Sequence, residues 1–282
     1  MSNTTEIARR PETYVLGHTS QEYERLRAQA RDWEAATARI LGQIGLPADA
    51  SCLDAGCGPG ETTRLLAQRV GRGGRVLGID LDASIGALAV QMLHGSGYRH
   101  CAFHPHDLTA DEPVPGGPFD LVYARLLLVH LPDRAAVLAR LWDAVAPGGY
   151  LVVQDYDAAA FGIVPDLPSF AEMTRVILGT FQAVGADVRT GALLPQLFVR
   201  AGVGIPDGTD VTGRVERLGA GGLAYAENVY RSLLPAALAH GITTAADSAA
   251  MLGELAKDAL QFADSPVLWP LMIGAWKRKG LA

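Results

Sequence analysis

The segment with the clearest chemical meaning is residues 53–63, which read LDAGCGPGETT. Its glycines, Gly56, Gly58 and Gly60, allow a sharp backbone turn and let a ligand approach without meeting a Cβ atom. The segment follows a predicted strand and opens a predicted helix, so a ligand would lie over the helix N-terminus at the carboxyl ends of the strands. This context turns a glycine pattern into a predicted binding loop.

The glycine spacing distinguishes between cofactors. A dinucleotide fingerprint needs a small residue at the last position of Gly-x-Gly-x-x-Gly. Counted from Gly56 that position holds Glu61, and counted from Gly58 it holds Thr63. An acidic residue at the helix start would also repel a diphosphate. The loop therefore favours a cofactor with little negative charge over a nicotinamide dinucleotide.

A carboxylate follows the loop at Asp80, the last residue of the predicted strand 75–80. About 20 residues after such a loop, a carboxylate can accept hydrogen bonds from both ribose hydroxyls. The alternative is that Asp80 only caps the next helix. Its position after the glycine loop favours ribose binding.

The elements that must position these residues alternate along the first half of the chain. Hydrophobic patterning predicts strands at 51–55, 75–80, 101–104, 119–124 and 150–155, and helices at 22–41, 61–70, 82–93 and 133–145. Such alternation predicts a mostly parallel sheet covered on both faces. In the second half we expect helices at 169–184, 193–201, 220–240 and 244–262, an exposed strand at 209–217 and a buried strand at 267–276.

Four motifs together resemble the Rossmann-like (class I) S-adenosylmethionine (SAM)-dependent methyltransferases. They are the glycine loop, the strand ending at Asp80, residues 119–124 (FDLVYA) and residues 147–151 (PGGYL), and they span residues 48–156 in the family's order. Residues 14–18 and 24–29 are similar to the N-terminal segment of bacterial small-molecule (natural-product) members. The resemblance implies an α/β fold with a seven-stranded, mostly parallel sheet whose last strand is antiparallel.

The resemblance also implies how SAM would be held. The backbone at Gly56, Cys57 and Gly58 would line its amino-acid end. Asp80 would hold the ribose and Leu81 would pack on the adenine. The full predicted set of cofactor-binding residues is Tyr14, Gln29, Asp54, Gly56, Cys57, Gly58, Asp80, Leu81, Asp107, Leu108 and Ala124.

Three residues are candidates for the acceptor side. His130 stands where the family places a residue beneath the reacting centre, and its imidazole could accept a proton near neutral pH. A structural histidine is the equal alternative. Arg125 and Asp155 follow the fourth and fifth strands, where they could orient the acceptor or be paired elsewhere.

Two other patterns are weaker. Cys101 with His100, His104 and His106 does not supply a closed metal shell, so we expect no metal site. Six aromatic residues in the second half are candidates for an apolar acceptor pocket, although aromatic spacing is the same in an ordinary core. They are Phe161, Phe170, Phe181, Tyr225, Tyr230 and Trp269.

Composition limits the function classes. The chain has 282 residues, 49% of them hydrophobic, three cysteines and a net charge of −6. This charge disfavours a nucleic-acid substrate, and no apolar run reaches the roughly 20 residues of a membrane span. The polar first ten residues and the few cysteines predict a cytoplasmic protein.

With the resemblance to class I SAM-dependent methyltransferases, these patterns lead us to expect a single domain, residues 1–282. The resemblance implies that it methylates a small aromatic or heteroaromatic metabolite with SAM, leaving S-adenosylhomocysteine. Residues 1–47 would form a helical cap, 48–156 the SAM-binding half and 157–282 the substrate-side half. The insertion at about 220–262 would be a lid or a homodimer surface. A SAM-binding regulator without catalysis is the main alternative, and a nicotinamide-dependent oxidoreductase is a distant one.

Overall fold

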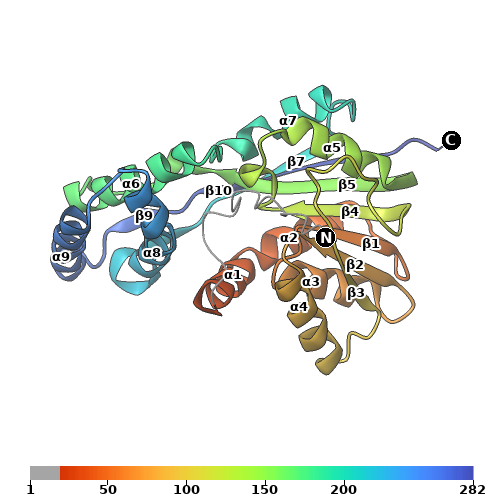
Figure 1. Ribbon diagram of the computed structural model, residues 1–282, viewed down its shortest axis with the longest axis horizontal. Coiled ribbons are helices and arrows are strands. Elements are labelled where there is room, and N and C mark those ends of the chain that lie inside the picture. Colours follow the sequence, from red (N-terminus) through yellow and green to blue (C-terminus); the bar gives the residue numbers. More distant parts are fainter. Residues whose placement is uncertain (1–19, 282) are drawn as a thin grey trace, which may run out of the picture.

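The computed structural model describes residues 20–281, which are built around a seven-stranded sheet (Figure 1). The strands lie in the order β3-β2-β1-β4-β5-β10-β7. Their bounds are β1 (Ser51–Ala55), β2 (Arg75–Asp80), β3 (Cys101–Pro105), β4 (Phe119–Arg125), β5 (Val145–Asp157), β7 (Gly208–Thr212) and β10 (Leu271–Arg278). Strands β1 to β5 are parallel, and β10 is antiparallel to both β5 and β7. The predicted Rossmann-like sheet with an antiparallel last strand is confirmed.

Successive side chains along each strand point to opposite faces of this sheet, so both faces carry buried side chains. Helices cover both faces. One face packs against α2 (Glu34–Gln43), α3 (Glu61–Val70) and α4 (Ala83–Gly95). The other face packs against α5 (Arg134–Asp143) and α7 (Thr190–Arg200). In β1, for example, Cys52 belongs to the first core and Leu53 to the second.

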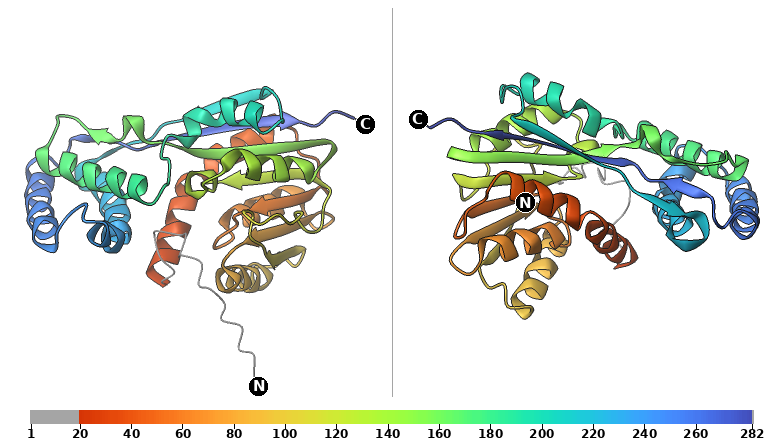
Figure 2. Two further views of the ribbon diagram at one scale, coloured as in Figure 1. Left: turned by 45° about the horizontal axis from the view of Figure 1, so that its top comes forward. Right: turned by 180° about the vertical axis from the view of Figure 1, so that it is seen from behind.

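A helical lobe adjoins the end of the long strands β5 and β10 (Figures 1 and 2). It contains α6 (Pro168–Ala183), α8 (Leu223–Ala239) and α9 (Ala245–Gln261), which share a third core. A small sheet in the order β6-β9-β8 joins them, made of β6 (Gly162–Ile163), β8 (Val215–Arg217) and β9 (Pro266–Leu268). The predicted helices of the second half are all present, within a few residues of their expected ends.

Three predicted elements are interrupted in the structure. The expected strand 209–217 divides at Gly213 into β7 and β8, and the expected strand 267–276 divides at Pro270 into β9 and β10. Proline cannot donate to a strand ladder, which explains the second break. The expected helix 22–41 divides at Trp33 into α1 (Ser20–Asp32) and α2, where the buried indole donates to Tyr156. The small second sheet was not predicted.

The carboxyl ends of β1, β2, β4 and β5 meet at one edge of the main sheet, and α1 lies between this edge and the helical lobe (Figure 2). Ligands of open α/β sheets bind at this edge, where the strand order reverses. Here the reversal falls between β1 and β4. No helix in the described part of the chain is long and apolar enough to cross a membrane.

Candidate active site

The glycine loop turns at the end of β1 as the sequence predicts. Gly56, Gly58 and Gly60 all have positive φ, at +68°, +47° and +81°. The N–H groups of Gly56 and Cys57 donate to the carbonyl of Ile79 at 2.9 and 3.0 Å, which ties the loop to β2. A Cβ atom built on Gly58 would meet no atom within 4 Å. The loop is therefore held open at Gly58, where a ligand can approach the backbone.

Asp80 and Leu81 stand beside this opening. One carboxylate oxygen of Asp80 accepts from the Gly58 N–H at 2.9 Å, and the other accepts from the Asp82 N–H at 3.0 Å. Burial raises the pKa of the Asp80 carboxyl. Leu81 leaves 64% of its surface exposed. A carboxylate beside a large exposed apolar side chain suits the ribose and adenine of an adenosyl group.

Four other predicted cofactor residues, Ala124, Asp54, Leu108 and Asp107, have different surroundings. Ala124 is buried at the end of β4, and Asp54 is buried beneath the loop, where it accepts from the Thr63 hydroxyl at 2.6 Å. Burial raises the pKa of Asp54 to about 7. Leu108 packs in the core, and Asp107 accepts from the backbone and hydroxyl of the nearby Thr109.

Cys57 is a buried thiol, and this burial raises its pKa well above the ordinary range. Its side chain therefore stays uncharged, which fits a residue used through its backbone. Tyr14 lies outside the described residues. Gln29 lies on α1 and lines the neighbouring cavity described below.

Helix α1 reaches the cofactor edge through two polar contacts. The Tyr23 hydroxyl donates to Asp82 at 3.0 Å, and Arg27 contacts Glu61 at 3.1 Å. Glu61 also pairs with Arg64 at 3.1 Å. These arginines offset the charge of Glu61 at the helix start, so its repulsion of a diphosphate stays a prediction. The glycine spacing argues against a dinucleotide independently of this charge.

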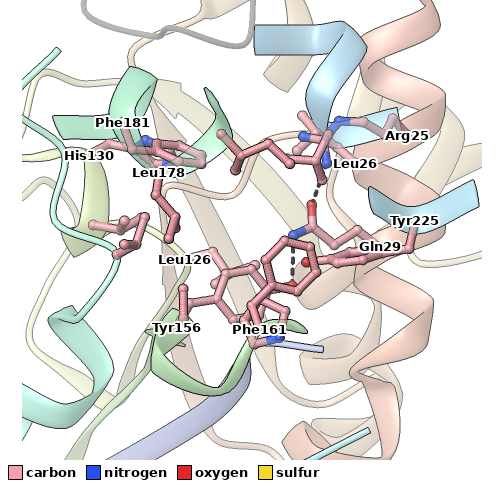
Figure 3. Close-up of a pocket in the computed structure, with 16 residues that line it drawn as sticks. Arg25, Leu26, Gln29, Leu126, His130, Tyr156, Phe161, Leu178, Phe181 and Tyr225 are labelled. Carbon is pink, nitrogen blue, oxygen red and sulfur yellow. Dashed lines mark hydrogen bonds between the residues drawn. The ribbon is translucent and has the colours of Figure 1, made fainter. Parts of the chain in front are cut away.

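A cavity opens next to the glycine loop, between α1, α6, α8 and the ends of β4 and β5 (Figure 3). Its walls are mainly aliphatic and aromatic. The lining residues are Arg25, Leu26, Gln29, Leu126, Val129, His130, Tyr156, Ala158, Phe161, Ile177, Leu178, Phe181, Val188, Tyr225, Val229 and Pro270. An apolar cavity with a few polar groups at this edge is typical of a small-molecule site.

His130 is the predicted catalytic residue that the structure brings to this cavity. It ends the short 3-10 helix η1 (Leu128–His130) and is half-buried. Burial, and then the charges of Arg25 and Arg134, lower the pKa of His130 to about 4. The imidazole is therefore neutral at pH 7, and one ring nitrogen can accept a hydrogen bond. Leu126, with a φ of +54°, makes the turn that leads into η1.

Arg125 and Asp155 do not line the cavity. Asp155 is fully buried, and its carboxylate accepts from the N–H groups of Val129 and Tyr156 at 3.0 and 2.9 Å. Arg125 donates to the Thr37 hydroxyl at 3.0 Å on the α2 side of the sheet. Strand alternation turns both side chains away from this cavity, so the structure does not bring either residue to the place where we expected it to contact an acceptor.

The structure separates the six candidate aromatic residues into two sets. Phe161, Phe181 and Tyr225 line the cavity, whereas the other three are buried in the lobe core. Those core residues are Phe170, Tyr230 and Trp269. Sequence reasoning missed Arg25 and Tyr156 as cavity residues. Tyr156 could have been found, because it is the last residue but one of β5, at the ligand-binding edge.

The histidine-rich segment around Cys101 shows no metal-type arrangement. His94 and His100 contact backbone carbonyl oxygens, of Cys101 at 2.9 Å and Ala67 at 3.2 Å. Within residues 20–281 no group of three or more histidine, cysteine, aspartate or glutamate side chains is placed to hold a metal ion.

The chain is similar to known methyltransferases over much of its length. A family model described as a methyltransferase domain matches residues 23–190. Trans-aconitate 2-methyltransferase of Methylobacterium nodulans is 36% identical over 135 residues, which are 44% of this chain and 49% of that protein. The chain thus spans about half the length of the curated relatives it matches.

Solved structures agree with the fold. A provisionally assigned methyltransferase from Bacillus halodurans C-125 has a TM-score of 0.58 at 14% identity, and the match covers 87% of this chain and 99% of that one. A SAM-dependent methyltransferase from Aquifex aeolicus has a TM-score of 0.50 at 18% identity, and covers 71% of this chain and 93% of that one.

Proposed function

Since the chain belongs to the class I SAM-dependent methyltransferases, we propose that it transfers a methyl group from SAM to a small aromatic or heteroaromatic metabolite. The observation that carries this proposal is the shared edge of the sheet. The open glycine loop at the end of β1 and the apolar cavity at the ends of β4 and β5 lie next to each other there. The methyl donor and its acceptor can therefore bind side by side at the same edge of the sheet.

SAM supplies an electrophilic methyl group on a sulfonium, so the protein has mainly to align the acceptor and exclude water. In this proposal the backbone at Gly56 and Gly58 holds the amino-acid end and Asp80 accepts from the ribose. Leu81, exposed in the structure, packs on the adenine. Helix α1, which contacts Asp82 and Glu61, closes the site from above.

The lining of the cavity supports an aromatic acceptor, including an indole-like one. Phe161, Phe181 and Tyr225 supply flat apolar surface to the cavity. The curated relatives are named for trans-aconitate, which carries three carboxylates. Among the described lining residues, Arg25 is the only one charged at neutral pH, because the low pKa of His130 leaves it neutral. Three carboxylates would lose hydration there without matching cations.

We assign His130 a place beside the reacting atom of the acceptor, whether that atom is oxygen, nitrogen or carbon. Its neutral imidazole accepts a hydrogen bond from the acceptor and so orients it. A pKa of about 4 makes the ring a weak base, so transfer does not depend on full protonation of His130. Asp155 positions His130 indirectly, because its carboxylate holds the Val129 N–H in η1.

The cavity also supports a single functional domain. Its walls come from the cap (α1), the SAM-binding half (η1 and β5) and the substrate-side half (α6 and α8). Tyr225 and Val229 belong to the 220–262 insertion and line the cavity, which favours a role as a wall or lid over a dimer surface.

Two measurements test the proposal. Calorimetry should detect binding of SAM and S-adenosylhomocysteine and none of NAD(H). Transfer of radiolabelled methyl should then be seen to members of a panel of phenols, indoles and other heteroaromatics, and not to trans-aconitate. Transfer to trans-aconitate alone would contradict the aromatic assignment. Tight SAM binding with no transfer to any acceptor would favour the non-catalytic regulator instead.

A further inference from the structure

Arg125 is a buried cation at the carboxyl end of β4. Only 9% of its surface is exposed, and its guanidinium donates to the Thr37 hydroxyl of α2 at 3.0 Å. Within residues 20–281 it forms no ion pair with an acidic side chain. A buried charge is costly unless an opposite charge and hydrogen bonds compensate it. One hydroxyl does not supply that compensation, so Arg125 is a candidate group for binding an anion.

Asp54 of the adjacent strand β1 does not supply the opposite charge. Its carboxylate accepts from the Thr63 hydroxyl at 2.6 Å and forms no ion pair with Arg125. Burial raises the pKa of Asp54 to about 7, although the Thr63 hydroxyl and the charge of Arg125 act against this rise. Asp54 is therefore only partly ionised at neutral pH and does not balance the guanidinium.

The other donors of Arg125 face accessible space rather than packed protein. A guanidinium carries five N–H hydrogens, and the contact with Thr37 uses one of them. In the described part of the chain, the buried polar side-chain atoms without a partner include no nitrogen of Arg125. Its remaining donors therefore reach open space. Because Arg125 is the last residue of β4, this space lies at the carboxyl edge of the sheet, where ligands bind.

Arg125 also lies beside the start of the glycine loop. The residue before it, Ala124, pairs with the last residue of β1, and the loop begins at the next residue, Gly56. A Cβ atom built on Gly56 would come within 2.8 Å of the side chain of Leu127, two residues after Arg125. Because side chains alternate along β4, Arg125 shares with Tyr123 the face that α2 and α3 cover. The glycine loop opens α3, so the guanidinium lies on the loop's side of the sheet.

We propose that Arg125 binds the carboxylate at the amino-acid end of SAM. This inference rests on the proposed function, because it adds a residue to the cofactor site of that function. A guanidinium and a carboxylate form paired, charge-assisted hydrogen bonds, which would supply the anion that Arg125 needs. Arg27 and Arg64, which also lie near the loop, are already paired with Glu61. Arg125 thereby selects intact SAM over adenosyl compounds that lack the carboxylate.

The test compares S-adenosylhomocysteine with its decarboxylated analogue, S-adenosyl-3-thiopropylamine, which keeps the adenosine, the thioether and the amine. Isothermal titration calorimetry gives the dissociation constant of each. The analogue should bind the wild type about 10- to 100-fold more weakly, the effect of a lost charge-assisted contact. Arg125→Met should lower the ratio of the two constants at least about tenfold, because it weakens binding of S-adenosylhomocysteine and not of the analogue.

Two further variants separate the charge of Arg125 from its packing. Arg125→Lys keeps a positive charge without the planar guanidinium, so its ratio should lie between those of the wild type and Arg125→Met. Arg39→Met is the matched control, since Arg39 is another arginine that ties α2 to the sheet, through Asp210 at 2.7 Å. Its ratio should equal that of the wild type.

The outcomes separate this inference from the proposed function. An unchanged ratio in Arg125→Met, with both ligands weakened alike, would show a structural role and overturn the inference alone. If Arg125→Met does not fold, the wild type still decides, because equal affinity for the two ligands overturns the inference. Absence of S-adenosylhomocysteine binding to the wild type would instead overturn the proposed function.

Discussion

Replacement of Asp80 by alanine tests the cofactor site most sharply. The carboxylate already accepts from Gly58 and Asp82, and in our account it also accepts from the ribose hydroxyls. A hydrogen bond to a charged group contributes about 1.5–3 kcal/mol, and water replaces part of it in the variant. Asp80→Ala should therefore weaken S-adenosylhomocysteine binding by about 1–3 kcal/mol, roughly 5- to 150-fold in Kd.

Isothermal titration calorimetry with S-adenosylhomocysteine measures this change directly. Asp120→Ala is a matched control, because Asp120 also accepts a backbone N–H, that of Ser51 at 2.8 Å, but at the opposite edge of the sheet. It should lose some stability and no affinity. A Kd of Asp80→Ala within twofold of the wild type, in folded protein, would refute the ribose role.

Three further predictions concern the loop, the buried acid and the histidine. Gly58→Val should weaken S-adenosylhomocysteine binding more than about tenfold, because its side chain fills the ligand's space and adds strain at positive φ; near-native affinity in calorimetry would contradict this. Burial raises the pKa of Asp155 to about 7, above its unfolded value, so its contribution to the free energy of unfolding falls as pH rises from about 4 to 7. Asp155→Asn should flatten this pH dependence, which urea unfolding at several pH values measures. If the unfolding free energies of the variant and the wild type change with pH in parallel, the prediction is contradicted. Because His130 orients the acceptor in our proposal, His130→Ala should lower turnover about 100-fold through misalignment, with SAM affinity intact. Wild-type turnover should be flat from pH 6 to 8, and an inflection near 6.5 would oppose a pKa near 4.

The cofactor edge could be predicted because its signals are local. The positive φ angles at Gly56, Gly58 and Gly60 need glycine, and the strand before Asp80 needs a short apolar run. Alternation of strands and helices then implies the parallel sheet. These features depend on neighbouring residues, so the sequence displays them directly.

The acceptor cavity could not be predicted in the same way. Its walls come from α1, η1, α6 and α8, which meet only through tertiary packing. Phe170 in the core and Phe181 in the cavity lie on the same helix, α6, and nothing in their spacing separates them. Asp155 and Tyr156 are adjacent, but strand alternation buries the first and turns the second towards the cavity.

The central claim is that the glycine loop and the cavity form one site for the methyl donor and its acceptor. A crystal structure with S-adenosylhomocysteine tests this most directly. We predict that the adenosine lies beside Asp80 and Leu81, and that the sulfur atom faces the cavity next to Leu126 and His130. A complex in which the sulfur atom points away from the cavity, or in which the ligand binds elsewhere, would contradict the account.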